Sequence, residues 1–127
     1  SARSIRPDNF NLYFTAIKPD QSLPDGDFYC VSMIDVLHHV PVEDQEKCIK
    51  NISCTKAKRI IVTDIDPDAK IKSRFNTLHD IVVSRQVPKY CRPDQVKQWL
   101  MESGFEITAS DRTDMLWYSH YYIVADR

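Results

Sequence analysis

Glycine is the residue that this sequence most lacks, since its 127 residues include only Gly26 and Gly104. A loop that holds phosphate groups or a dinucleotide needs clustered glycines, because its backbone must turn tightly and approach the ligand closely. The two glycines are far apart in the sequence. A glycine-rich nucleotide-binding loop is therefore excluded within these residues.

An excess of charge of one sign is also missing: 17 basic and 18 acidic side chains give a net charge of −1. The chain as a whole has no electrostatic attraction for a phosphate backbone, so nucleic acid is not indicated as a partner. No apolar run approaches the roughly 20 residues of a membrane span, and no signal-peptide core is visible. We therefore expect no membrane partner and a cytoplasmic location.

The four cysteines lack any C-x-x-C spacing. Cys30 falls within a predicted buried strand and Cys48 on the face of a predicted helix, so both are expected to be small core residues. A disulfide framework or a metal site is the less favoured alternative. This use of cysteine fits a reducing compartment, and no metal site is expected.

Hydrophobic residues make up 43% of the chain, enough for the core of one domain over residues 1–127. Patterning predicts strands at 10–17, 28–33, 57–65, 105–109 and 115–125, and helices at 41–54, 69–84 and 93–103. Residues 28–33 and 57–65 are almost continuously apolar, as in strands buried on both faces. A short polar turn at 111–114 predicts a closing antiparallel hairpin. The fold class is thus α/β, with helices on both faces of the sheet.

The most informative stretch begins where the second predicted strand ends, at Asp35, and includes His38 and His39. Ligands of open α/β sheets bind outside the carboxyl ends of such strands. Asp35 either faces a ligand or caps the following turn. The two histidines are adjacent, so we expect them to point in different directions and not to share a metal ion. One is a candidate general base, because histidine titrates near neutrality, and the other is structural.

Other polar and aromatic residues have a functional and a structural interpretation. Asp64 and Asp66 end the next strand and could reach the same edge, although acids before a proline are also common turn formers. His79 lies at the border of the apolar stripe of the predicted 69–84 helix, which favours a structural role. Four aromatic side chains are mostly expected in the core or on a sheet face, and an aromatic binding pocket is the minority interpretation. These residues are Tyr90, Trp117, Tyr118 and His120.

Two motifs resemble those of class I S-adenosylmethionine-dependent methyltransferases. Residues 27–40, with Asp27-Phe28 leading to Val36-Leu37-His38-His39-Val40, resemble the fourth strand and following loop of that family. The helix ending in Gly104-Phe105 and the last predicted strand resemble the family's closing elements. The similarity covers residues 10–127, the carboxyl two-thirds of such a domain. The amino-terminal third, with the glycine loop, has no counterpart here.

The resemblance implies a Rossmann-like methyltransferase domain that uses S-adenosylmethionine in the complete protein, with an unidentified methyl acceptor. His38 or His39 would be catalytic. Cofactor contacts would come from Asp35, Val36 and Leu37, and from Asp20, which stands in an unusual register after the first predicted strand. Because the glycine loop is absent, this chain alone is expected to bind the cofactor weakly or not at all.

Two alternatives to an active methyltransferase remain. The first is a non-catalytic, methyltransferase-like interaction or scaffolding module that has lost cofactor binding. The second is a nicotinamide-dependent enzyme, which the closing hairpin disfavours. The family's strand order would leave the 28–33 strand with an unpaired edge, so we expect a homo-oligomer or an upstream segment to complete the sheet.

Overall fold

The computed structural model describes residues 21–24, 26–67, 90–115 and 118–127. The predicted strand 10–17 and the predicted helix 69–84 lie outside these residues. So do two of the candidate site residues, Asp20 and His79. Every structural statement below concerns the described part of the chain.

Four strands form one mixed sheet: β1 (Cys30–Ile34), β2 (Arg59–Ile65), β3 (Glu106–Met115) and β4 (Tyr118–Asp126). Their order across the sheet is β1-β2-β4-β3. β1 runs parallel to β2, with Ile34 opposite Thr63, whereas β4 runs antiparallel to both β2 and β3. The predicted α/β class and the antiparallel ending are therefore confirmed.

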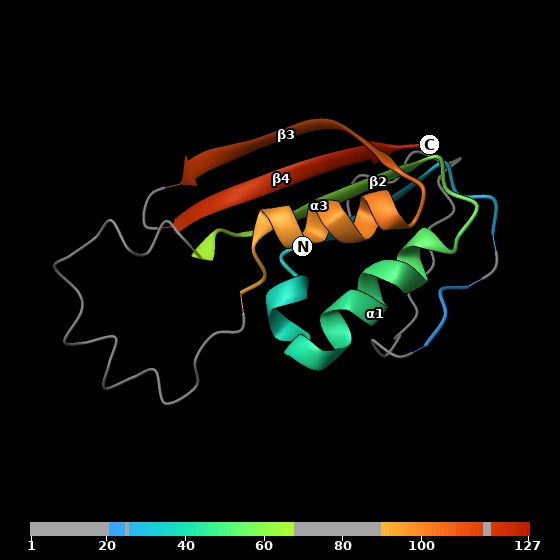
Figure 1. Ribbon diagram of the computed structural model, residues 1–127, viewed down its shortest axis with the longest axis horizontal. Coiled ribbons are helices and arrows are strands. Elements are labelled where there is room, and N and C mark those ends of the chain that lie inside the picture. Colours follow the sequence, from blue (N-terminus) through green and yellow to red (C-terminus); the bar gives the residue numbers. More distant parts are fainter. Residues whose placement is uncertain (1–20, 25, 68–89, 116–117) are drawn as a thin grey trace, which may run out of the picture.

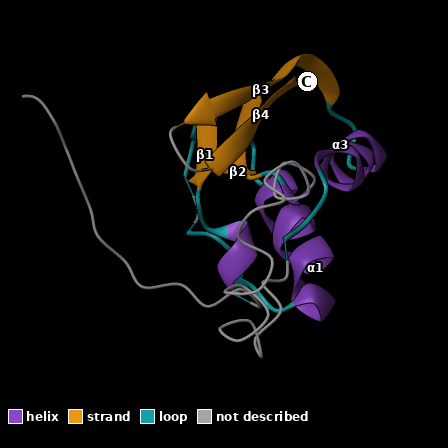
Figure 2. Ribbon diagram, turned by 90° about the vertical axis from the view of Figure 1, so that its left-hand side faces the viewer, coloured by secondary structure: helices purple, strands orange, loops and turns teal. Residues whose placement is uncertain are grey.

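The two described α-helices begin and end within one residue of the predicted positions. Helix α1 (Val42–Ser53) follows Pro41 and has Glu43 and Asp44 in its first turn; acids there favour the positive end of the helix dipole. Helix α3 (Pro93–Glu102) has proline at its first position. Gly104 follows it with φ of 89°, a left-handed conformation that glycine adopts without strain. Figures 1 and 2 show α1 and α3 together on one side of the sheet.

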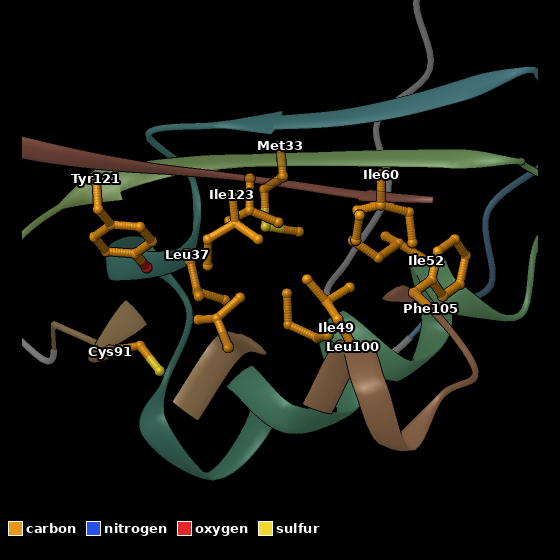
Figure 3. Close-up of a cluster of buried hydrophobic side chains, with 13 residues drawn as sticks. Met33, Leu37, Ile49, Ile52, Ile60, Cys91, Leu100, Phe105, Tyr121 and Ile123 are labelled. Carbon is orange, nitrogen blue, oxygen red and sulfur yellow. The ribbon is translucent and has the colours of Figure 1, made fainter. Parts of the chain in front are cut away.

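The core lies between this sheet face and the helices (Figure 3). Ile60 and Val62 contribute from β2, and Tyr121, Ile123 and Ala125 from β4. Ile49 and Ile52 of α1 and Val96 and Leu100 of α3 pack against them, as their helical spacing predicts. Removing this apolar surface from water is the main contribution to the stability of the domain.

The prediction that β1 is buried on both faces is wrong for the described residues. Met33 is buried and Val31 is packed against the core, but Cys30 and Ser32 are exposed and Ile34 is 61% exposed. Cys30 is therefore not a core residue, although all four cysteines are free thiols as expected. The reason is that α1 and α3 cover one face only (Figure 2). The apolar composition of β1 thus suits a strand that is covered on both faces, whereas the described residues cover only one.

The predicted turn at 111–114 is also wrong, because β3 continues through these residues to Met115. β3 is one of the two outer strands of the described sheet and pairs there only with β4. Asp111 and Asp114 are exposed there. An outer strand of a sheet accommodates polar side chains. In this segment they therefore do not mark a turn.

Candidate functional site at the carboxyl ends of β1 and β2

A short 3-10 helix, η1 (Leu37–His39), directs the chain away from the end of β1. Before it, Asp35 has φ of +53°, and its backbone N–H donates to Thr63 O at 2.8 Å, which continues the pairing with β2. The buried Gln45 of α1 then donates to Leu37 O at 3.2 Å and to Val40 O at 3.1 Å. The backbone around η1 is therefore tied to β2 on one side and to α1 on the other.

His38 makes two contacts with the buried carboxylate of Asp64. Its Nδ1 lies 2.6 Å from Asp64 Oδ1, and its backbone N–H donates to Oδ2 at 3.0 Å. Oδ1 also accepts from the backbone N–H of Ile65 at 2.7 Å. The Asp64 side chain is 3% exposed and the His38 side chain 16%. Asp64 thus holds both the backbone and the ring of His38.

Two further rings lie beside His38. The His39 ring is 4.0 Å away between centroids and the Tyr90 ring 5.9 Å away. The prediction that the two histidines point in different directions is therefore wrong, because η1 brings their rings together. The described residues contain no group of three or more ligands suited to a metal ion. The arrangement is an aromatic cluster around one histidine–aspartate pair.

Asp35 contacts a second histidine, His120 of β4. Asp35 Oδ1 lies 3.4 Å from His120 Nε2, with side-chain exposures of 49% and 21%. His120 Nδ1 is buried and has no hydrogen-bond partner among the described groups. The capping role considered for Asp35 is not found, because neither η1 nor α1 has a side-chain capping bond. Asp35 is instead half of an open histidine–aspartate pair.

Buried polar groups continue behind Asp64. Asp66 is buried and forms an ion pair with Arg112 Nε of β3 at 2.6 Å. Burial, followed by the charge of Asp64, raises the pKa of the Cys91 thiol to about 11. Burial and the nearby Asp64 also raise the pKa of Tyr121. Tyr121 and Cys91 both lie in the layer between sheet and helices (Figure 3).

Two surface hollows lined by described residues lie elsewhere, with volumes of about 640 Å³ each. Both are lined by Asp27, Thr55 and Lys56, and the second is also lined by Phe28 and Tyr29. They are at the amino end of β1, opposite the two histidine–aspartate pairs. Their charged contact is an exposed pair, Lys56 Nζ to Asp27 Oδ1 at 3.8 Å. We place the candidate site at the carboxyl ends, because the buried titratable groups are there.

The residues predicted to contact the cofactor differ in their exposure to solvent. Asp35 and Val36 are exposed at the end of β1, where a ligand could reach them. The Leu37 side chain is fully buried in the core, so any contact from Leu37 would have to use its backbone. Asp20 lies outside the described residues. Cofactor binding by these residues stays a prediction.

Sequence reasoning placed Asp64 at the same edge as His38 but missed their pairing. The available signal was the parallel pairing of two strands that each end in an acid, since their carboxyl ends meet at one edge. The pairing of His120 and Arg112 with acids had no such signal. It depends on the register of β3 and β4, which brings residues from the end of the chain to this edge.

Together, the parallel pair β1–β2, the closing antiparallel strands and the polar groups at the carboxyl ends define a Rossmann-like α/β domain of the class I methyltransferase kind. Residues 2–110 match the family described as a methyltransferase domain, and since this is well over half of the chain, the chain belongs to that family. A comparison with curated proteins found no match.

Solved structures of methyltransferases share this fold. Magnesium protoporphyrin IX methyltransferase from Synechocystis with bound SAH is 22% identical with a TM-score of 0.68, over 90% of this chain and 50% of that one. The S-adenosylmethionine-dependent methyltransferase SibL is 21% identical with a TM-score of 0.59, over 89% and 35%. An O-methyltransferase family 2 protein from Planctomyces limnophilus, in complex with apigenin, is 11% identical with a TM-score of 0.55, over 84% and 31%. The chain thus spans half or less of their lengths.

Among the described residues, no helix is both long and apolar enough to cross a membrane.

Proposed function

We propose that this chain is part of an S-adenosylmethionine-dependent methyltransferase, with the cofactor near Asp35 and Val36 and the methyl acceptor near His38 and His39. The observation that carries this proposal is the His38–Asp64 pair at the carboxyl ends of parallel strands, in a chain of the methyltransferase family. Two related structures of magnesium protoporphyrin IX methyltransferase contain bound SAH or bound SAM, which supports this choice of cofactor.

The described residues fit part of such a cofactor. Asp35 offers a half-exposed carboxylate, which suits a ligand ammonium or hydroxyl group, and Val36 offers an exposed apolar side chain. A glycine-rich loop would have to come from elsewhere, because Gly26 and Gly104 are the only glycines. When bound, the cofactor supplies an electrophilic methyl group. The role of His38 or His39 would be to remove a proton from the acceptor.

Calorimetry with S-adenosylhomocysteine tests the proposed cofactor. We expect the complete protein to bind it and Asp35→Ala to weaken binding. Asp27→Ala is the matched control, because it removes an exposed acid at the opposite end of β1. The 127-residue chain alone should bind weakly or not at all, and a dissociation constant on the order of micromolar for it would show that the missing loop is not needed. No binding by the complete protein would contradict the proposal.

The alternative function is a methyltransferase-like interaction module that does not bind the cofactor. The exposure of apolar side chains in and just before β1 favours it, since Tyr29 is 67% exposed and Ile34 61%. β1 pairs only with β2 among the described strands, and an unpaired edge can recruit another strand. We propose that a second copy or an upstream segment covers this edge, with a homo-oligomer favoured for the isolated chain. A cytoplasmic location remains a prediction.

Light scattering at low micromolar concentration tests the β1 edge. We expect the isolated chain to be larger than the 14.8 kDa monomer, and Ile34→Lys to shift it toward the monomer, because edge lysines oppose strand pairing. Val42→Lys is the control, since it places the same charge at an exposed apolar position on α1. A monomeric wild-type chain would contradict self-association.

A further inference from the structure

The two surface hollows at the amino end of β1 adjoin each other, because three residues line both of them. Their walls come from the segment before β1 and from the loop between α1 and β2. We call the second one the basic hollow; it is lined by Asp27, Phe28, Tyr29, Thr55, Lys56, Lys58 and Arg127. It lies at the end of β1 opposite the two histidine–aspartate pairs, so the proposed methyltransferase function does not use it.

Cations outnumber acids in the basic hollow. Three of its side chains are basic, and Asp27 is the only acid among the described residues that line it. Asp27 lies 3.8 Å from Lys56 Nζ, and both side chains are exposed, so water screens this pair. Lys58 is exposed and forms no ion pair with another described residue. The hollow therefore attracts a negatively charged group.

The third cation, Arg127, is fixed in position. Its guanidinium donates to Ser53 O at 3.2 Å and to Ala57 O at 3.0 Å. It also lies 4.4 Å from the centre of the Phe105 ring. These partners are neutral groups, so they hold the guanidinium without cancelling its charge. A cation that is positioned before a ligand arrives loses little entropy when the ligand binds.

Two aromatic side chains lie exposed beside these cations. Phe28 is 42% exposed and Tyr29 67%. The backbone of Tyr29 is fixed, because its carbonyl oxygen accepts from the N–H groups of Lys58 at 2.9 Å and Arg59 at 3.0 Å. Aromatic side chains on a fixed backbone are frequent anchors of protein interfaces, since they offer a large contact area and lose little conformational entropy.

We propose that the basic hollow binds an acidic segment of a partner protein, in which carboxylates flank an apolar residue. The carboxylates pair with Lys58 and Arg127, and the apolar residue packs against Tyr29. An extended segment suits two adjoining, open hollows better than a small molecule, which proteins usually enclose. A nucleic acid is less suited, because the chain has a net charge of −1 and Asp27 lies within the hollow.

NMR titration of the ¹⁵N-labelled complete protein at low ionic strength tests the site and the ligand class. The probe is the acetylated pentapeptide Glu-Glu-Phe-Glu-Glu. We expect the backbone amides of residues 27–29 and 56–58 to shift, and those of residues 35–39 to stay in place. The matched control peptide, Gln-Gln-Phe-Gln-Gln, should bind about tenfold more weakly because it lacks the charges. Unshifted amides at 27–29 and 56–58, or equal binding of the two peptides, would overturn the proposal.

Two substitutions in the hollow should change the affinity for the acidic peptide in opposite directions. Lys58→Ala should weaken binding by roughly threefold, whereas Asp27→Asn should tighten it by roughly the same factor, because it removes the opposing acid. Lys47→Ala removes an exposed lysine of α1 outside both hollows and is the matched control.

A variant that had only lost its fold could not bind more tightly, so Asp27→Asn makes the test independent of folding. Unchanged or weaker binding by Asp27→Asn would overturn the proposal, and so would equal weakening in Lys58→Ala and Lys47→Ala. Tighter binding of hexauridine than of the acidic peptide would assign the hollow to nucleic acid and would also overturn it. None of these measurements needs the cofactor or the methyl acceptor.

Discussion

The two histidine–aspartate pairs of this chain contain the same side chains in different environments. Asp64 is buried and lies 2.6 Å from its histidine, on the sheet face that the helices cover. Asp35 is half-exposed and lies 3.4 Å from its histidine. The first pair is shielded from solvent and supported by two backbone N–H groups, whereas the second is open to screening by water and salt. Burial and backbone support, rather than residue type, distinguish a fixed base from a weak surface contact.

The largest expected difference between the pairs is in catalysis. In the complete protein with its acceptor, His38→Ala should lower turnover by roughly 10²–10⁴, the usual contribution of a general base. His120→Ala is the matched control and should stay close to wild type, because its partner Asp35 is 3.4 Å away and open to solvent. Release of S-adenosylhomocysteine gives the rate. Equal losses of turnover in His38→Ala and His120→Ala would contradict the assignment of His38 as the base.

Stability should separate the two acids as well. Asp64→Ala leaves the His38 N–H and Nδ1 without their acceptor, so the free energy of unfolding should fall by about 3 kcal/mol, as for lost hydrogen bonds to a buried charge. Chemical denaturation measures this change. Asp64→Asn keeps the volume but offers one acceptor oxygen where the contacts use two. If the free energy of unfolding of Asp64→Asn falls by about 1–3 kcal/mol, the effect is assigned to hydrogen bonding. If it falls in Asp64→Ala alone, the effect is assigned to the cavity that the smaller side chain leaves.

Alkaline pH tests the surroundings of the buried pair through Cys91. Burial and Asp64 raise its pKa from the ordinary 9.0 to about 11, so the folded state keeps a proton that the unfolded chain releases earlier. The contribution of protonated Cys91 to the free energy of unfolding is therefore complete below pH 9. The free energy of unfolding should fall by roughly 2 kcal/mol as pH rises from about 9 to about 11. Denaturation across this range should show a smaller decline in Cys91→Ala. An unchanged slope would mean that Cys91 does not titrate as expected.

The smallest effect is expected at the open pair. Asp35→Ala should change the free energy of unfolding by less than about 1 kcal/mol, because half-exposed ion pairs contribute little. High salt should reduce even this difference, whereas it should leave the loss in Asp64→Ala nearly unchanged. Denaturation with and without added salt makes the comparison. A salt-insensitive loss at Asp35 would place it in a more buried environment than its exposure indicates.

Much of the fold was predictable because short-range chemistry determines it. Pro41, Pro93 and Gly104 mark helix ends through backbone restrictions that act within one turn. The apolar spacing of Ile49 and Ile52 follows from helix geometry alone. Burial of β1 was predicted wrongly, because apolar composition reports the surroundings of a strand in a complete sheet and not within one part of it.

The site was predictable only where the chain itself places it. His38 follows β1 directly, and Asp64 ends the strand beside it, so both could be assigned to one edge. Which acid pairs with which histidine depends on the conformation of η1 and on the register of β4. Neither follows from spacing, because a 3-10 turn or a β-bulge displaces side chains by a distance comparable to that of the contact itself.

Arg127 connects three elements that are distant in the sequence. Its guanidinium donates to Ser53 O, Thr55 O and Ala57 O around the end of α1, and lies 4.4 Å from the centre of the Phe105 ring. Its backbone N–H also donates to Lys58 O, just before β2. The end of α1, the start of β2 and the end of β4 should therefore open together in native-state hydrogen exchange, as one cooperative unit.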